Sequence, residues 1–240
     1  MRAEPLIGSR RRCLEPSMEP PRLRRLRPLC HRSCHELHLP RPRGCGSSRI
    51  RSARGIEVKI EKIIEAIERA RKGIAQYLEI MELFSDTDVS IDKDFQRKYN
   101  AFYRIRQRRP DWYEEYYSYM QSQKGQHPTF SLVLRHLYSI LGRYEPSFSS
   151  KFVATIDVNS PVWDSVLLRH AGIKIPLYTS KSKVDQAETT YKQLQVWHER
   201  HMRSDNGRLI LQTFEEMVPE YYRISDLKKI DFVLWQSRVE

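Results

Sequence analysis

The chain has 240 residues, 40% of them hydrophobic and 30% charged, and its 42 Lys and Arg against 30 Asp and Glu give a formal net charge of +12. No run approaches the roughly 18 apolar residues that a membrane-spanning helix needs, which excludes a transmembrane protein. The 8 Phe, 4 Trp and 13 Tyr can bury more apolar surface than an intrinsically disordered chain contains, so part of the chain folds.

The positive charge and the capacity to fold lie in different parts of the chain. Residues 1–55 hold 14 Arg, no Lys and four Glu, so they contribute +10 of the net charge. The same residues include all four Cys and seven of the 13 Pro but no aromatic residue, and a segment of this composition cannot form a hydrophobic core. We therefore predict a disordered Arg- and Pro-rich tail over 1–55 and one globular domain over 56–240.

Three interpretations of the tail stay open. Its Arg content and its scarcity of acidic residues fit a mitochondrial transit peptide, although its prolines would interrupt the amphipathic helix that such a peptide needs. A second interpretation is an arm that binds nucleic-acid phosphates, for which arginine has a suitable geometry. The third is a segment without structure, or a non-native extension in front of a start of translation further along the chain.

Cysteine and histidine residues of the tail form a candidate zinc site, made of Cys30, Cys34 and His38. Thiolate and imidazole are zinc ligands, but the spacing lacks the paired C-x-x-C motif, so we prefer to interpret these residues as stray members of a disordered tail. The domain over 56–240 has no cysteine and needs no disulfide. We expect a reducing, cytoplasmic location, at the nucleoid in a bacterium, and favour it over a mitochondrial one.

Hydrophobic residues recur at helical spacing along the domain, and we expect an all-α fold of about nine orthogonally packed helices. Asp92 and Thr129 are placed to cap helices, Pro110 to begin one and Gly142 to end one. The expected helices cover about 56–84, 92–109, 110–120, 129–142, 148–156, 161–171 and 181–203, with two more over 206–236. Glycine-rich phosphate-binding loops are missing from the sequence, which disfavours a nucleotide cofactor.

Residues 144–174 carry the side chains with the clearest chemical meaning. Small residues, among them Ser147 and Ser149, lead into Lys151, which we place in the first turn of a helix. There the positive end of the helix dipole would lower the pKa of Lys151 and favour the neutral amine. Asp164 follows a Ser-Pro pair and is expected at the start of the next helix. An amine of lowered pKa facing a carboxylate is an arrangement for nucleophilic attack through a Schiff base.

The same stretch resembles the active-site region of the helix-hairpin-helix DNA glycosylase superfamily, in particular the 8-oxoguanine DNA glycosylase fold. The resemblance rests on a small-apolar-small-x-Lys motif ending at Lys151 and a Pro-apolar-apolar-Asp motif ending at Asp164. It implies that Lys151 attacks the sugar of a damaged nucleotide, that Asp164 supports the reaction, and that DNA is the partner. The implied activity is excision of a damaged purine such as 8-oxoguanine, with AP-lyase activity and without a cofactor. The glycine-rich hairpin that precedes the lysine in that family is replaced here by residues 145–149.

Other residues have two interpretations each. Four arginines expected at the end of the second helix suit the negative end of its dipole and could equally contact phosphates, as could the hydroxyls of Ser147 and Ser149. These arginines are Arg104, Arg106, Arg108 and Arg109. The aromatic run over 112–119 could stack bases, although its helical spacing favours core packing. His198 and His201 lack the spacing of a metal-binding motif, and we expect them on the exposed surface.

The alternative function is a non-catalytic helical module that binds DNA, RNA or protein, with the basic tail supplying affinity. The placement of Lys151 and Asp164 discriminates between the two functions. An enzyme needs both side chains at one concave pocket, whereas a binding module allows them on different faces in open solvent.

Overall fold

The computed structural model describes the backbone of residues 47–237 and the side chains of residues 59–237. Residues 1–46 of the predicted tail lie outside the described residues, together with the zinc candidates Cys30, Cys34 and His38. None of the helices within the described range combines the length and the apolar composition needed to cross a membrane.

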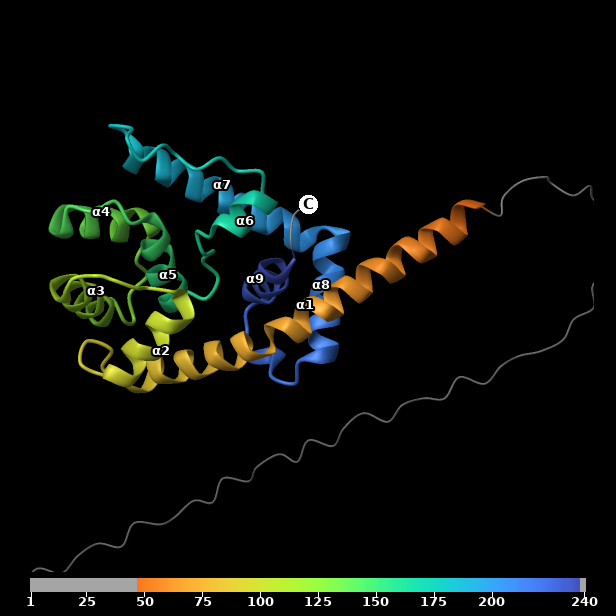
Figure 1. Cartoon of the computed structure of the whole chain (residues 1–240), viewed down its shortest axis with the longest axis horizontal. Coiled ribbons are helices and arrows are strands. Elements are labelled where there is room, and N and C mark those ends of the chain that lie inside the picture. The colour runs from red at the N-terminus through yellow and green to blue at the C-terminus, as the bar shows by residue number, and fades with distance from the viewer. Residues whose placement is uncertain (1–46, 238–240) are drawn as a thin grey trace, which may run out of the picture. The chain divides into compact units, whose positions relative to one another are not determined.

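Residues 47–237 form nine α-helices, one 3-10 helix and no strand, which confirms the predicted all-α class (Figure 1). The helices are α1 (Ser47–Asp86), α2 (Lys93–Tyr103), α3 (Pro110–Ser122), α4 (Phe130–Leu141), α5 (Pro146–Ile156), α6 (Ser165–His170), α7 (Lys183–Arg203), α8 (Asp205–Met217) and α9 (Asp226–Gln236), and the 3-10 helix is η1 (Tyr221–Arg223). α1 begins ahead of residue 56, where we expected the helical domain to begin.

Helix ends follow the capping residues that the sequence offers. The side chain of Asp92 accepts a hydrogen bond from Phe95 N at 2.7 Å at the start of α2. Thr129 Oγ1 accepts one from Leu132 N at 3.2 Å at the start of α4. Gly142 ends α4 in the left-handed region, with a φ of 63°, where a glycine meets no steric penalty. These three predicted caps are confirmed.

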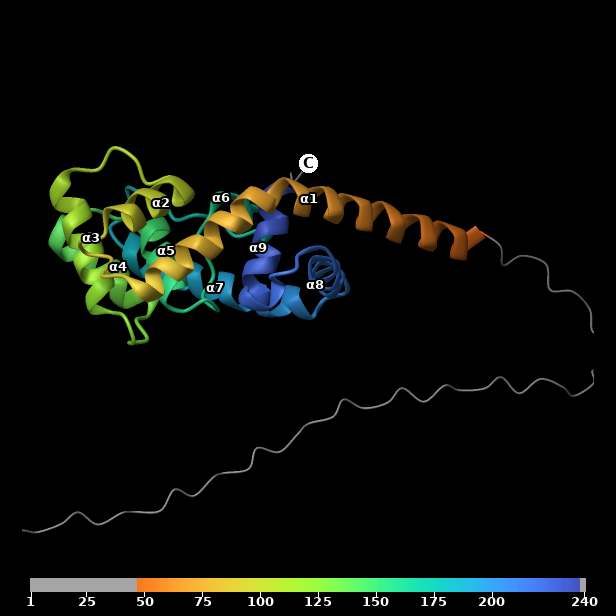
Figure 2. The same ribbon diagram turned by 90° about the horizontal axis from the view of Figure 1, so that it is seen from below.

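Three groups of buried side chains hold the helices together. α1 runs along the described unit, with α2 at its C-terminal end and with α8 and α9 beside its middle (Figures 1 and 2). The first group joins α1, α8 and α9 with one residue of α6. The second joins α2, α3, α4 and α5 to the end of α1, and the third joins α4, α6 and α7. Large members are Phe214 and Phe232 in the first group, Tyr99 and Phe152 in the second, and Phe130 and Tyr191 in the third.

The aromatic run of α3 lies in this core. Trp112, Tyr116 and Tyr117 are buried, which confirms core packing as the role of the run. The Tyr116 hydroxyl donates a hydrogen bond to Phe148 O at 3.0 Å and so ties α3 to α5. Because a buried hydroxyl without a partner is costly, this bond restricts how α5 can sit against α3. α5 is the helix that carries Lys151.

Candidate active site

Lys151 and Asp164 line the same cavity, which has a volume of about 540 Å³. Five helices supply its lining: the middle of α1, the end of α2, α5, the start of α6 and the end of α9. A cavity of this size can hold a nucleoside-sized ligand, because small-molecule sites span about 300–1,000 Å³. The two side chains therefore have the placement that we expected of an enzyme.

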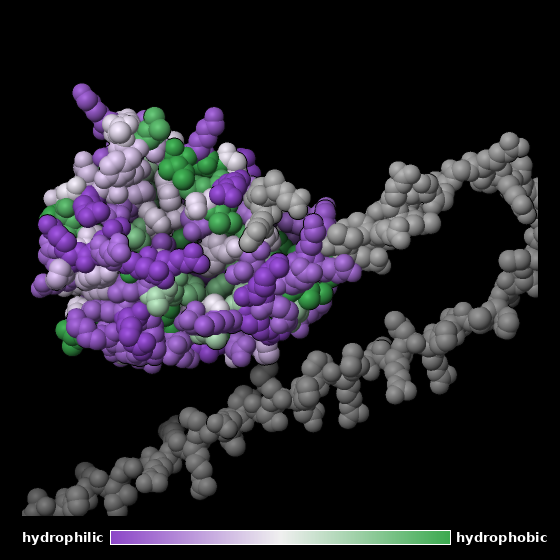
Figure 3. Space-filling view, viewed as in Figure 1, coloured by the Kyte–Doolittle hydropathy of each residue, from purple (hydrophilic) through white to green (hydrophobic). Residues whose placement is uncertain are grey.

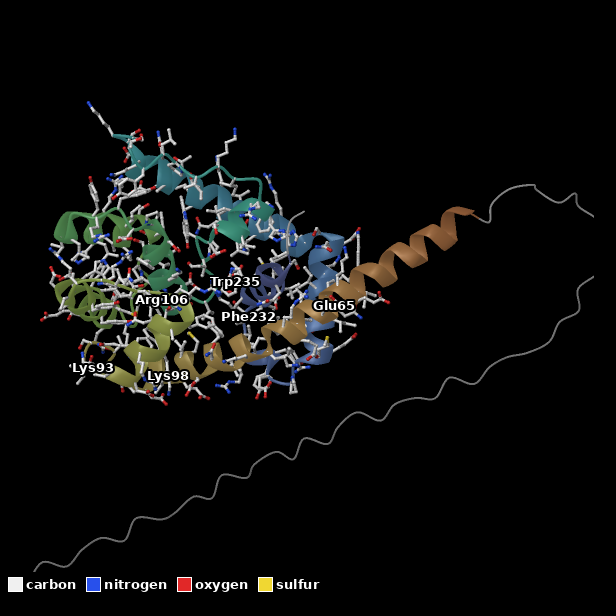
Figure 4. The ribbon with its side chains drawn as sticks, viewed as in Figure 1. Glu65, Lys93, Lys98, Arg106, Phe232 and Trp235 are labelled. Carbon is white, nitrogen blue, oxygen red and sulfur yellow. The ribbon has the colours of Figure 1, made fainter. Side chains whose placement is uncertain are left out.

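Aromatic rings form part of the cavity lining, together with polar and charged side chains. Phe102, Phe148 and Trp235 each contribute a ring, from α2, α5 and α9 respectively. Figure 4 shows Phe232 and Trp235 on α9, beside α1 and in the interior of the described unit. The outer face in Figure 3 is mostly hydrophilic, with apolar atoms visible between polar rows near its middle. A ligand in the cavity would therefore meet aromatic rings as well as the charged groups of Lys151 and Asp164.

Lys151 lies in the second turn of α5 and not, as we predicted, in the first. The helix begins at Pro146, because proline at the first helical position loses only an N–H that has no intrahelical partner there. The influence of the helix dipole falls off within the first turn. The helix dipole is therefore not the main cause of the lowered pKa of Lys151.

Burial is the main cause of the lowered pKa of the Lys151 amine. Burial lowers the pKa of Lys151 to about 8, while the Asp164 carboxylate opposes this change and the Arg104 guanidinium adds to it. The Nζ atom donates a hydrogen bond to Tyr103 O at 3.1 Å and lies 4.9 Å from the ring centroid of Phe148. A substantial share of the amine is thus neutral near pH 8, and the neutral form is the nucleophile.

Asp164 caps the start of α6, as predicted. Its Oδ1 accepts a hydrogen bond from Val166 N at 2.8 Å, and among the described residues no hydrogen bond reaches the second carboxylate oxygen. Two serines of α5 hold the backbone in front of it. Ser150 Oγ accepts from Trp163 N at 2.8 Å, and Ser147 Oγ donates to Trp163 O at 3.0 Å. These bonds attach the segment before α6 to α5 and hold Asp164 at the cavity.

The four candidate arginines lie beyond the end of α2, because that helix ends at Tyr103 and not near residue 109. Arg104 adopts the left-handed conformation, with a φ of 55°, and lines the cavity. Arg106 is exposed. Arg109 is also exposed and pairs with Asp111 at 2.6 Å. Of the four, Arg104 is the arginine that the cavity lining includes.

Arg108 is held by two aromatic rings and a carboxylate. Its guanidinium lies 4.9 Å from the ring centroid of Phe148 and 5.7 Å from that of Trp112, and 3.4 Å separate it from the Glu145 carboxylate. Arg143 pairs with the same carboxylate at 3.1 Å. Burial raises the pKa of Glu145, and both arginines oppose that change. Arg108 thus packs against the aromatic core next to the cavity.

Two of the candidate residues are buried. Ser149 donates its hydroxyl to Glu145 O at 2.9 Å and has no exposed surface for a ligand. His198, which we expected on the exposed surface, is 1% exposed, and its Nε2 lies 3.0 Å from Asp231 Oδ1. That expectation is wrong. The sequence of α7 is polar, but His198 is buried against Asp231, which lies 33 residues further along the chain. His201 is half-buried, and burial lowers its pKa.

No group of three or more His, Cys, Asp or Glu within the part of the chain that the structure describes is placed to hold a metal ion.

Sequence reasoning missed most of the cavity lining. Phe102 and Trp235 are apolar positions of helices, and their residue types give no sign that both rings line the cavity of Lys151. The Tyr103 carbonyl, which accepts the lysine hydrogen bond, is a backbone group and leaves no trace in the sequence. Only the meeting of α2, α5 and α9 brings these groups together.

Comparisons with models of protein families, with curated proteins and with solved structures find no match to this chain.

Proposed function

We propose that the protein is a DNA base-excision enzyme, a glycosylase with AP-lyase activity that acts on a damaged purine such as 8-oxoguanine. One observation carries the proposal: an amine whose pKa is lowered to about 8 shares a cavity, partly lined by aromatic rings, with a carboxylate. The resemblance to helix-hairpin-helix glycosylases agrees with this arrangement. The proposed substrate makes DNA the partner and fits the expected cytoplasmic or nucleoid location.

The proposed reaction begins with extrusion of the damaged nucleotide from the duplex, at an unstacking cost of a few kcal/mol. Its base enters the cavity beside the rings of Phe102, Phe148 and Trp235, which supply apolar contact. The volume of the cavity, about 540 Å³, is sufficient for one nucleoside.

Lys151 then acts as the nucleophile. Its neutral Nζ attacks C1′ while the bond from C1′ to the base nitrogen breaks, and the base leaves with the electron pair of that bond. The nitrogen gives one proton to the departing base and its second proton to the ring oxygen as the sugar opens, which leaves a C=N Schiff base between Nζ and C1′. Loss of a proton from C2′ then expels the 3′ phosphate. The Asp164 carboxylate balances the positive charge that develops on the sugar.

Trapping with borohydride tests this proposal. The full chain is incubated with duplex oligonucleotides that contain either 8-oxoguanine or an abasic site, and borohydride reduces any Schiff base to a stable adduct. We expect an adduct with the wild type and with Lys192→Ala, whose lysine is exposed on α7, and none with Lys151→Ala. Absence of the wild-type adduct, or an adduct that survives Lys151→Ala, would contradict the proposal. DNA binding without an adduct would favour the non-catalytic module.

Replacing Arg104 with alanine should move the pH profile of trapping to higher pH. The Arg104 guanidinium helps to lower the pKa of Lys151, so its removal raises that pKa from about 8 towards the ordinary value. Less of the amine is then neutral at pH 7, and trapping on abasic DNA slows. The measurement is the initial rate of trapping from pH 6 to 10. Arg106→Ala is the matched control, because Arg106 is exposed outside the cavity lining, and an unchanged midpoint for Arg104→Ala would refute the electrostatic role.

A further inference from the structure

The cavity wall that α9 supplies is connected to three buried ionisable side chains, the triad Lys228, Asp231 and His198. Lys228 and Asp231 are 0% exposed and His198 is 1% exposed. Lys228 Nζ lies 3.3 Å from Asp231 Oδ2, and His198 Nε2 lies 3.0 Å from Asp231 Oδ1. Each oxygen of the carboxylate thus has one partner. The triad joins α9 to α7 at a fixed point.

The lysine of the triad contacts the cavity wall. Lys228 Nζ lies 5.0 Å from the ring centroid of Trp235 and 5.6 Å from that of Tyr77. Trp235 is one of the residues that line the cavity of Lys151. A desolvated ammonium is attracted to an aromatic face, so the ammonium that Asp231 holds also holds the indole.

Stability does not account for these buried charges. Removing a charge from water costs several kcal/mol, and apolar residues of similar volume in place of a buried ion pair are often neutral or stabilising. Apolar contacts, however, tolerate small rotations and shifts of a helix, whereas hydrogen bonds between charged groups require one geometry. A triad that specifies one position of α9 also specifies the position of Trp235.

We propose that Lys228, Asp231 and His198 form a positioning unit that holds Trp235 in place to receive the base of the extruded nucleotide. The inference rests on the proposed function. None of the three side chains lines the cavity, so the unit acts through Trp235 and not on the reacting atoms. It therefore governs how a base-bearing nucleotide is accepted. An abasic nucleotide, which has no base to place against Trp235, does not need it.

The test compares two substrates for the full-length protein, a duplex with 8-oxoguanine and a duplex with an abasic site. His198→Leu removes the donor to Asp231, and His198→Gln keeps an amide donor near the position of Nε2. We expect His198→Leu to slow trapping on 8-oxoguanine DNA by about 10- to 100-fold, and to leave trapping on abasic DNA within about twofold of the wild type. His198→Gln should restore most of the loss.

Lys229→Met is the matched control for α9. Lys229 is the neighbouring buried lysine, and it pairs with Glu215 at 3.0 Å and Asp226 at 2.8 Å instead of contacting Trp235. We expect its replacement to leave the ratio of the two rates unchanged. If thermal denaturation shows that His198→Leu does not fold, Lys228→Met takes its place with the same expected selective loss.

A double-mutant cycle completes the test. If the triad acts through Trp235, adding His198→Leu to Trp235→Ala causes no further loss on 8-oxoguanine DNA. Equal losses on both substrates, no loss on either, or an additive loss in the cycle would overturn the inference. A wild type that traps neither substrate would instead overturn the proposed function, and this inference with it.

Discussion

Replacing Lys151 with methionine is expected to end borohydride trapping and, at neutral pH, to make the protein more stable. A thioether cannot form an imine, so no adduct is possible at this position. In the wild type, burial lowers the pKa of Lys151 from 10.5 to about 8, a cost to the folded state of about 3 kcal/mol. The methionine variant avoids this cost but loses the hydrogen bond to Tyr103 O, which reduces its gain in stability by about 1 kcal/mol. We expect the free energy of unfolding to rise by about 2 kcal/mol in urea denaturation at pH 7.

The pH dependence of this gain identifies the buried ammonium as its cause. The pKa of Lys151 is lower in the folded state, so the unfolded state binds more protons between about pH 8 and 10.5, and wild-type stability rises with pH in this range. The advantage of methionine is therefore full below pH 8 and is lost by pH 10.5. Lys192→Met, at an exposed position, should show no such change. A gain that stays constant from pH 7 to 10.5 would contradict the account.

Replacing Asp164 with asparagine separates its role as the cap of α6 from the role of its negative charge in the cavity. Asparagine caps helices as well as aspartate does, so the bond to Val166 N is kept and stability should be unchanged. The negative charge is lost, and we expect the rate of trapping to fall by about 100-fold or more. Asp164→Ala should lose the same activity and, in addition, about 1 kcal/mol of stability with the cap. Rates of trapping on abasic DNA and urea denaturation of the three proteins supply the comparison.

Protonation of the lysine cannot explain such a loss. The Asp164 carboxylate raises the pKa of Lys151, so asparagine lowers that pKa and leaves more neutral amine at pH 7. Asp92→Asn is the matched control, because Asp92 caps α2 in the same way, through Phe95 N, and does not line the cavity. A trapping rate for Asp164→Asn equal to that of the wild type would reduce Asp164 to an ordinary helix cap.

The local features of the site could be predicted from the sequence because they depend on neighbouring residues. The cap at Asp164 follows from the Ser-Pro pair in front of it, and the helical class follows from the spacing of apolar residues. The position of Lys151 within its helix was predicted wrongly, although Pro146 offered a signal for an earlier start. We therefore attributed the lowered pKa of Lys151 to the helix dipole, whereas its main cause is burial.

The rest of the site depends on contacts between distant parts of the chain. A helical period shows which face of α9 points inward, but it does not show that Trp235 meets the wall of a cavity near Lys151. The same limit applies to His198, whose place on a polar helix predicted exposure although Asp231 binds it in the interior. Buried pairs of charged residues are set by helix packing, which a single sequence does not specify.

The central claim is that the Lys151 amine is the nucleophile, and mass spectrometry of the trapped complex tests it most directly. Wild-type protein is trapped on abasic DNA, the DNA is digested, and the proteolytic peptides are sequenced to locate the sugar remnant. We predict a reduced sugar adduct on Lys151, with trypsin cleavage blocked at that residue. An adduct on another lysine or on the N-terminal amine, with Lys151 unmodified, would contradict the account.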